Sequence, residues 1–274
     1  MGLISTIVVA IIQGITELFP VSSLGHAVVL PVLLRLKDMD IRSDAFLPLL
    51  VVLHVGTAIA LMLYFWRDWL GIASAFFDRD RERRREQFRL LLLVIVGTVP
   101  AVIVGFLLER HIRELFGTAV IAAFFLIVNG VLLFAVERLK QDGKNPISAL
   151  SVVDAVIIGV WQCLALIPGI SRSGATIAGG LLLGLTHEAS ARFSFLLATP
   201  IILGAAVLEV PKLLKSGEHI TSVALLGGLV AGVTAFIAVA VLMRWMKSHE
   251  FKALDPFAYY CVGFGALSLV LLSA

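Results

Sequence analysis

The sequence is poor in charged residues. Only 15% of its 274 residues are Asp, Glu, Lys or Arg, whereas a soluble domain carries about 25%. This shortage, together with 59% hydrophobic residues and a mean hydropathy of +1.01, excludes an ordinary soluble fold. The sequence predicts a polytopic membrane protein with room for about six to eight spans of roughly 20 residues each, and for no second, soluble domain.

Cysteine is scarce as well. Cys163 and Cys261 lie in apolar segments without metal-ligand spacing, and we interpret them as small buried hydrophobic residues. No basic residue precedes the first apolar segment, so we do not expect a cleavable signal peptide. The net charge of +3 is typical of arginine in cytoplasmic loops and does not indicate nucleic-acid binding.

The apolar segments predict an all-α fold in one integral membrane domain, residues 1–274. Six runs are long enough to span a bilayer: residues 45–66, 90–108, 118–136, 190–210, 220–243 and 257–273. Two further apolar stretches, 3–36 and 151–185, are broken by Pro, Gly and Ser. We interpret each as a re-entrant helical hairpin, because non-helical backbone at membrane depth must be buried in protein or line water.

The loops alternate in basic content, which predicts the topology. The richer set holds 13 Lys and Arg residues and comprises loops 67–89, 137–150 and 244–252. The poorer set holds 6 and comprises loops 37–44, 109–117 and 211–219. The positive-inside rule places the richer set in the cytoplasm. Both termini are then outside, the first hairpin enters from outside, and the second enters from the cytoplasm.

An internal repeat connects the two hairpins. At an offset of 149 residues, Gln13 matches Gln162, Ser22 matches Ser171, and Gly25 matches Gly174. Because the hairpins enter from opposite sides, the predicted repeat is inverted. Its first half covers about 1–136 and its second half 151–274, joined by linker 137–150. Paired broken segments of this kind indicate a site near the membrane midplane.

The break in the second hairpin has the composition of an anion-binding site. Glycine lets backbone N–H groups approach a ligand, and a helix N-terminus favours negative charge. Arginine suits bidentate phosphate recognition. The candidate substrate-binding residues here are Gly169, Ser171, Arg172, Ser173, Gly174 and Thr176. An unpaired arginine at this depth is costly, so we expect an anionic ligand; the alternative is a structural ion pair between Arg172 and Glu17.

The first hairpin supplies groups that react. Glu17 can bind a divalent cation or act as a general base, and Gln13, one helical turn earlier, shares its face. Ser22 and Ser23 are candidate nucleophiles, and Ser22 is also a candidate substrate-binding residue. His26 can exchange a proton with a serine or a leaving oxygen. The two hairpins together predict phosphoryl transfer, although an inverted-repeat transporter or flippase of an anionic substrate needs a similar cradle. His54, in the span 45–66, is interpreted as a helix-contact residue.

Two motifs resemble those of a known family. Residues 17–26, Glu-Leu-Phe-Pro-Val-Ser-Ser-Leu-Gly-His, and residues 168–176, Pro-Gly-Ile-Ser-Arg-Ser-Gly-Ala-Thr, are similar to the signatures of the bacterial undecaprenyl-diphosphate phosphatases of the bacitracin-resistance (BacA/UppP) type. The likeness extends over the whole chain. It implies an enzyme that converts undecaprenyl diphosphate to undecaprenyl phosphate and inorganic phosphate in lipid-carrier recycling for peptidoglycan synthesis.

The resemblance also implies roles for individual residues. Glu17 would be the acidic residue, Ser23 the nucleophile and His26 its proton-transfer partner, with Arg172 on the diphosphate. Gln13 and Glu17 would hold Mg²⁺ or Ca²⁺. The expected partners are a polyprenyl diphosphate lipid and the bilayer, with no nucleic acid and with a homodimer left open. The expected location is the bacterial inner (plasma) membrane, with the active site facing the periplasm.

Two positions depart from the usual family pattern. Gln13 stands where Glu is common, and Leu24 stands where Thr is usual. A neutral amide should weaken metal binding, and Leu24 removes one hydroxyl from the phosphate site. The covalent route through Ser23 and a direct attack by water are both open at this point, as is the interpretation of the protein as a transporter of undecaprenyl phosphate.

Overall fold

The computed structural model describes residues 2–34, 46–108, 118–140, 143–215, 221–249 and 251–273, and these residues form helices without a strand. Five of the helices are long and apolar enough to cross a membrane. They are α5 (Arg81–Leu107), α7 (Ala119–Leu139), α10 (His187–Lys215), α11 (Ser222–Ser248) and α12 (Asp255–Ser273). The predicted all-α, multi-pass membrane fold is therefore confirmed.

A bent pair of helices completes the set of spans. Helix α3 (Phe46–Tyr64) meets α4 (Trp66–Ser74) at an angle of 71°, and counting the pair as one span gives six. The predicted span 45–66 covers α3 alone, and the bend was not anticipated. Predicted loops 37–44 and 109–117, and residues 216–219, lie outside the described residues.

The charged run 78–86 was assigned to a loop, and from residue 81 onward that assignment is wrong. Helix α5 begins at Arg81, nine residues before the predicted boundary at 90. Asp80 caps it, because its carboxylate accepts hydrogen bonds from the backbone N–H groups of Glu82 (2.9 Å) and Arg83 (3.4 Å). A charged helix of this kind is stable in water beyond the apolar segment, so hydropathy alone misplaced its start.

Two pairs of short helices stand at the predicted breaks. The first short-helix pair is α1 (Leu3–Leu18) and α2 (Ser23–Leu33). The second is α8 (Val152–Cys163), extended by η2 (Leu164–Leu166), and α9 (Arg172–Leu182), and it follows the turn η1 (Ile147–Ala149). Helices α2 and α9 both have 11 residues, and their bounds are 149 residues apart. The re-entrant course of the pairs and the inversion of the repeat stay predictions.

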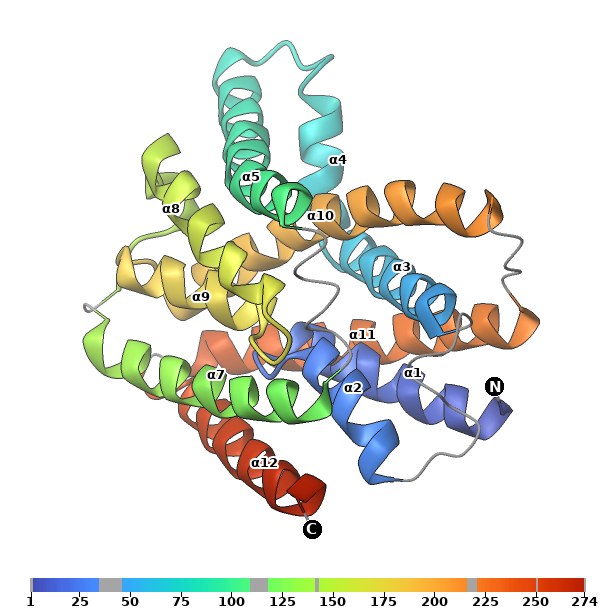
Figure 1. Cartoon of the computed structure of the whole chain (residues 1–274). Coiled ribbons are helices and arrows are strands. Elements are labelled where there is room, and N and C mark those ends of the chain that lie inside the picture. The colour runs from blue at the N-terminus through green and yellow to red at the C-terminus, as the bar shows by residue number, and fades with distance from the viewer. Residues whose placement is uncertain are drawn as a thin grey trace.

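The helices pack through small residues, as is usual where no hydrophobic force acts between helices in lipid. Helices α1 and α3 lie on α11, α8 lies on α5, and α7 lies on α12 (Figure 1). A Cβ added at Gly56 would come within 2.1 Å of the carbonyl oxygen of Gly228, and one at Gly159 within 2.4 Å of that of Gly97. Only glycine permits backbones to approach so closely.

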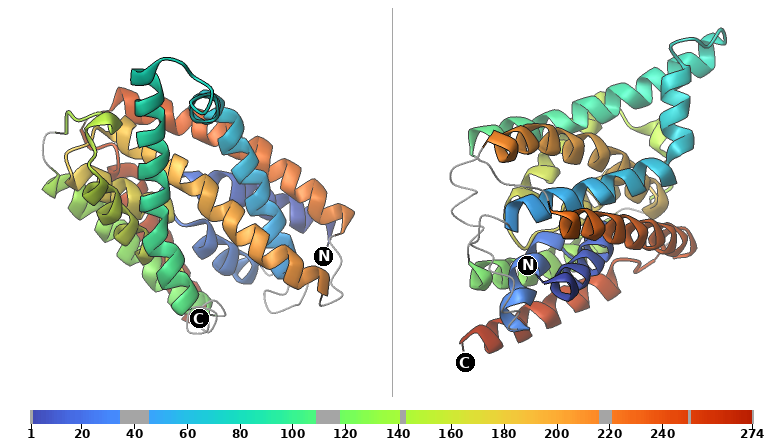
Figure 2. Two further views of the ribbon diagram at one scale, coloured as in Figure 1. Left: turned by 90° about the horizontal axis from the view of Figure 1, so that it is seen from above. Right: turned by 90° about the vertical axis from the view of Figure 1, so that its right-hand side faces the viewer.

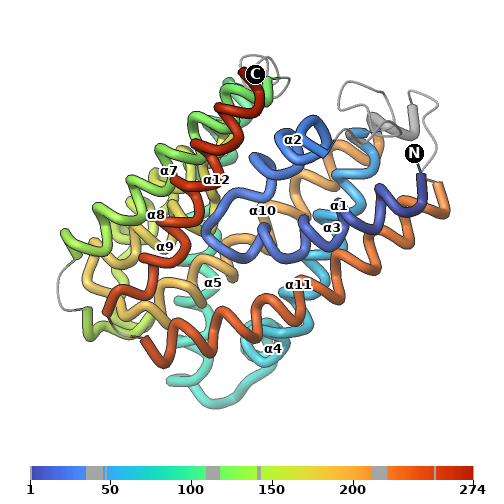
Figure 3. Tube along the Cα trace, turned by 90° about the horizontal axis from the view of Figure 1, so that it is seen from below, coloured from blue at the N-terminus to red at the C-terminus, as the bar shows by residue number. Residues whose placement is uncertain are grey.

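The arrangement places the two breaks inside the bundle. Both chain ends lie at one end of the long helices, and the α4–α5 connection lies at the other (Figures 2 and 3). The turn between α1 and α2 lies in the middle, between α10 and the α7–α12 pair (Figure 3). Polar residues of the first break are therefore enclosed by helices on several sides.

Candidate active site

The two breaks meet, and a buried amide joins them. Asn129, on α7, donates from Nδ2 to the carbonyl oxygen of Pro20 (3.0 Å) and accepts at Oδ1 from the backbone N–H of Ser171 (3.0 Å). Ser173 adds a hydrogen bond from its hydroxyl to the carbonyl of Phe19 (3.2 Å). Asn129 is fully buried. Leaving its amide, the Pro20 carbonyl or the Ser171 N–H without a hydrogen bond would therefore destabilise the fold. One α7 residue thus holds both turns together.

The carboxylate of Glu17 is the centre of the site. Its Oε2 accepts a 2.6 Å hydrogen bond from the Ser23 hydroxyl and a 3.2 Å bond from Nε2 of Gln13. Its Oε1 pairs with the Arg172 guanidinium at 2.9 Å. The Nε2 atom of His54, on α3, lies 3.4 Å from Oε2. The bond from Ser23 has the short length of a charge-assisted hydrogen bond.

This cluster lies at the wall of a cavity of about 400 Å³. Its polar lining residues are Thr16, Glu17, Ser22, Ser23, His54, Ser171, Arg172 and Glu209. The rest of the lining is apolar and comes from α2, α3, the η2 segment and α10: Leu24, Leu50, Val51, Ala165, Leu166, Ile170, Ile201, Ile202, Ala205 and Ala206. A cavity with one polar side and a long apolar wall suits an amphipathic ligand with an anionic head.

The structure brings together three of the four predicted catalytic residues. Glu17 contacts both Ser23 and Arg172, and the alternative ion pair between Arg172 and Glu17 is formed. His26 lies elsewhere. Its Nδ1 is 2.7 Å from the carbonyl oxygen of Ser22, its Nε2 is 2.8 Å from the hydroxyl of Tyr260, and its ring stacks on Phe264. Its role as proton-transfer partner stays a prediction.

The predicted substrate-binding residues divide into two groups. Ser22 and Ser171 line the cavity, while Gly169, Ser173, Gly174 and Thr176 do not. The amide of Gly174 donates to Ser171 Oγ (3.1 Å), so that helix-capping bond already occupies it. Thr176 pairs with the hydroxyl of Ser194 at 2.6 Å.

Gly169 has a conformational reason to be glycine. Its φ is +102°, and a Cβ there would lie 2.4 Å from the carbonyl oxygen of Ala122. The ligand-binding roles of the four residues outside the lining stay predictions.

Gln13 and Glu17 fit a hard divalent cation. The Oε1 atom of Gln13 is buried and has no hydrogen-bond partner, while its Nε2 is bound to Glu17. Among the described residues, no three His, Cys, Asp or Glu side chains form a metal cluster. Mg²⁺ commonly takes only one or two protein carboxylates and completes its shell with phosphate oxygens and water. One amide oxygen and one carboxylate would be compatible with that, once the Gln13 amide is turned so that Oε1 replaces Nε2 beside Glu17.

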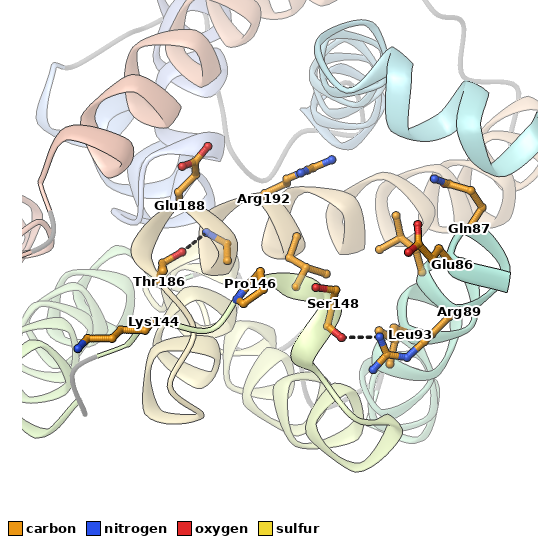
Figure 4. A pocket seen from close by; sticks show the side chains of 13 residues that line it. Glu86, Gln87, Arg89, Leu93, Lys144, Pro146, Ser148, Thr186, Glu188 and Arg192 are labelled. Atoms are coloured by element: carbon orange, nitrogen blue, oxygen red, sulfur yellow. Dashed lines mark hydrogen bonds between the residues drawn. The ribbon is translucent and has the colours of Figure 1, made fainter. Parts of the chain in front are cut away.

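A second cavity, of about 610 Å³, lies away from these residues, between the start of α5, the segment before η1 and the start of α10 (Figure 4). Its arginines are engaged in structural contacts. Arg89 donates to the carbonyl oxygens of Ser148 and Leu150, both at 2.5 Å, and Arg192 pairs with Asp68. None of the predicted site residues lines it, so the smaller cavity is the candidate active site.

Sequence reasoning missed three residues that hold the site. His54 was visible as an ionisable residue at membrane depth, which is a signal for function, but it was assigned to helix contact. Asn129 was visible as an amide in an apolar span. Tyr260 had no signal, because it lies 234 residues from its partner His26 in an ordinary apolar helix.

Comparison with known proteins gives a consistent result. Residues 6–267 match the family described as bacitracin resistance protein BacA. An undecaprenyl-diphosphatase of Granulibacter bethesdensis is 52% identical, over 98% of this chain and 97% of the relative. One of Gluconacetobacter diazotrophicus is also 52% identical, over 99% and 98%. An undecaprenyl-diphosphatase 2 of Oenococcus oeni is 41% identical, over 98% of each chain.

Proposed function

Because the chain belongs to the bacitracin resistance protein BacA family, we propose that it hydrolyses undecaprenyl diphosphate to undecaprenyl phosphate and inorganic phosphate. The observation that carries the mechanism is the 2.6 Å hydrogen bond from Ser23 to Glu17, whose other oxygen is held by Arg172. It joins a nucleophile, a base and an anion-binding cation at one cavity.

The first step is a phosphoryl transfer to Ser23. As Oγ of Ser23 bonds to the terminal phosphorus, its proton passes to Oε2 of Glu17. The bond from that phosphorus to the bridging oxygen breaks, and undecaprenyl phosphate leaves with the electron pair. Glu17, rather than His26, is the general base in this proposal, because neither ring nitrogen of His26 faces Ser23.

The second step releases phosphate. After Glu17 has lost its proton to solvent, it takes one from a water molecule whose oxygen attacks the phosphoserine. The bond between phosphorus and Ser23 Oγ breaks, and Oγ recovers the proton from Glu17. Water and the phosphoserine thus give free serine and inorganic phosphate, and the carboxylate returns to its starting state. Direct attack by water on the substrate is the competing route.

Arg172 neutralises the diphosphate in this proposal. It exchanges part of its contact with Glu17 for phosphate oxygens. The backbone N–H groups of Arg172 and Ser173, in the first turn of α9, would donate to the same anion, whereas that of Gly174 is bound to Ser171. Gln13 and Glu17 would hold Mg²⁺ or Ca²⁺, which would supply further positive charge to the phosphates. The apolar wall on α3 and α10 would take the first isoprene units.

The topology rule supports the location of the site. With the basic loops in the cytoplasm, the chain would lie in the bacterial plasma membrane with this cavity open to the outer, periplasmic side. The substrate would therefore be a lipid presented from the outer leaflet.

Phosphate release from a polyprenyl diphosphate by the purified protein in detergent tests the function. We expect release by the wild type, its loss with EDTA, and loss of roughly a hundredfold or more in Ser23→Ala. Ser248→Ala, on an exposed part of α11, is the matched control and should behave as wild type. Wild-type protein that is folded and releases no phosphate would refute the proposed activity.

A further inference from the structure

His26 is a buried, titratable side chain that the proposed chemistry does not use. It is 1% exposed and lies in the first turn of α2, three residues after Ser23. Neither of its nitrogens contacts Ser23, Glu17 or the cavity: Nδ1 faces the carbonyl oxygen of Ser22 (2.7 Å), and Nε2 faces the hydroxyl of Tyr260 (2.8 Å). A function for His26 must therefore operate through one of these two partners.

The chemistry of the partners fixes the tautomer. A carbonyl oxygen can only accept, so Nδ1 of His26 carries a hydrogen and donates it to Ser22. In the neutral ring Nε2 is then an acceptor, and the Tyr260 hydroxyl is its donor. The ring is also stacked, at 4.7 Å from that of Phe264 with the planes 4° apart. The Ser22 carbonyl therefore fixes the tautomer of His26, and Tyr260 and Phe264 of helix α12 fix the orientation of its ring.

The carbonyl that His26 holds belongs to a strained residue. Ser22 has φ +69° and ψ 96°, and the only other non-glycine residue with positive φ among those described is Lys252. Such a conformation persists only when its surroundings hold it. Ser22 immediately precedes Ser23, and its ψ sets the direction in which the next residue leaves the turn. A Ser22 held in this conformation places the Ser23 hydroxyl against Glu17.

We propose that His26 and Tyr260 are positioning residues: Tyr260 orients His26, and His26 holds the Ser22 carbonyl so that Ser23 meets its base. This inference rests on the proposed function, because it assigns Ser23 the nucleophilic role. In this proposal His26 does not transfer a proton. It is instead the middle of a hydrogen-bonded chain that runs from Tyr260 on α12 to the Ser22 carbonyl. The chain uses a residue, Tyr260, that lies outside both sequence motifs.

Substitution of Tyr260 tests the chain from its far end. Tyr260→Phe keeps the ring but removes one buried hydrogen bond, and we expect kcat to fall roughly two- to tenfold with KM unchanged. The fall should be the same at every pH, because no proton is transferred through this pair. Tyr259→Phe is the matched control; that residue is 63% exposed and should retain wild-type kcat. A changed pH profile in Tyr260→Phe, or no change in kcat, would overturn the proposal.

Substitution of His26 separates the two roles. The amide nitrogen of asparagine lies as many bonds from Cβ as Nδ1 of histidine, so His26→Asn can still donate to Ser22 but cannot exchange a proton near neutral pH. We expect His26→Asn to retain at least about ten times the kcat of His26→Ala. Equal loss in the two variants, with both remaining monodisperse in detergent, would support proton transfer and contradict positioning.

A measurement independent of turnover completes the test. In protein labelled with ¹⁵N-histidine, the resonances that disappear in His26→Asn should show the Nδ1–H tautomer, unchanged between pH 6 and pH 8. A different tautomer would refute the hydrogen-bonded chain whatever the activity. Failure of wild-type phosphate release together with the expected tautomer would instead refute the proposed function and leave the assigned geometry intact.

Discussion

The two short-helix pairs have the same frame and different chemistry. In each, a serine caps an 11-residue helix by accepting from the backbone N–H three residues later, Ser22 from Gly25 and Ser171 from Gly174. The side chains then diverge at the offset of 149 residues. The position of Glu17 is Leu166 in the second pair, and that of Ser23 is Arg172.

This difference explains how two similar turns make one asymmetric site. The first pair contributes the carboxylate and the hydroxyl, and the second contributes the guanidinium that pairs with that carboxylate. The proposed phosphoryl transfer uses residues of both pairs. Two similar backbone breaks thus supply two places where polar groups are held inside the bundle, and in the proposed mechanism their residues are the base and the anion clamp.

Removal of the base should have the largest effect. We expect Glu17→Gln to lower kcat by roughly 10²–10⁴-fold, the usual contribution of a general base, because the amide cannot take the Ser23 proton. Phosphate release under saturating substrate measures it. Glu188→Gln, at the other cavity, is the matched control. Activity of Glu17→Gln within tenfold of wild type would show that the first short-helix pair does not supply the general base.

Removal of the clamp should affect both activity and stability. Arg172→Ala should lower kcat/KM by roughly ten- to a hundredfold, the equivalent of about 1.5–3 kcal/mol for a charged hydrogen bond. It should also destabilise the fold by about 3–5 kcal/mol, because Glu17 is left buried without its cation.

Thermal unfolding in detergent separates these effects. In the double variant Arg172→Ala/Glu17→Gln, stability should partly return while activity stays lost. A double variant that is less stable than Arg172→Ala would contradict a direct ion pair between the two pairs of short helices.

Asn129 tests whether the turns depend on each other. Asn129→Asp keeps the acceptor for the Ser171 N–H but loses the donor to Pro20, and Asn129→Leu loses both. We expect each unpaired buried group to cost about 1–3 kcal/mol, with Asn129→Leu the less active variant. The control is Ser268→Ala, at a fully buried residue of α12 whose hydroxyl donates within its own helix. Wild-type activity and stability in Asn129→Leu would show that each turn holds its shape independently.

Substitution of the two matched glutamines, Gln13 and Gln162, should have the smallest effects. Loss of Gln13 should lower activity, whereas loss of Gln162 should raise stability. Gln13 donates to Glu17, whereas both polar atoms of buried Gln162 have no hydrogen-bond partner. Gln162→Leu should therefore raise the unfolding temperature by the equivalent of up to about 1–3 kcal/mol with activity unchanged. Gln13→Leu should lower activity and weaken the dependence on Mg²⁺ or Ca²⁺. The same change in activity and unfolding temperature in both variants would show that Gln13 and Gln162 do not differ in function.

Much of this architecture could be predicted from the sequence. Apolar length and the Pro, Gly and Ser breaks predicted the long helices and the positions of both turns, because lipid imposes strict limits on backbone polarity. The start of α5 and the 71° bend after α3 could not be predicted in this way. The first depends on the Asp80 cap and the second on how α3 and α4 pack, and hydropathy reports neither.

The site was predictable in its components and less so in its pairings. Glu17, Ser23 and Arg172 were identified from residue type and motif, but the sequence could not show that Ser23 faces Glu17 and not His26. That choice depends on how the turn at Ser22 places α2 against α1, which brings Ser23 to Glu17 while the ring of His26 contacts Ser22 and Tyr260. The contributions of Asn129 and Tyr260 required the α7–α12 pair to be placed beside the turns, and no local pattern in the sequence encodes that placement.

The most direct test of the central claim is a single-turnover experiment with polyprenyl diphosphate labelled on its terminal phosphate. The acid-quenched protein would be digested and the labelled peptide identified by mass spectrometry. We expect label on Ser23 in the wild type, its accumulation when water attack is slowed, and its absence in Ser23→Ala and Glu17→Gln. Normal turnover with no label on Ser23, or near-normal turnover by Ser23→Ala, would contradict the covalent route through Ser23.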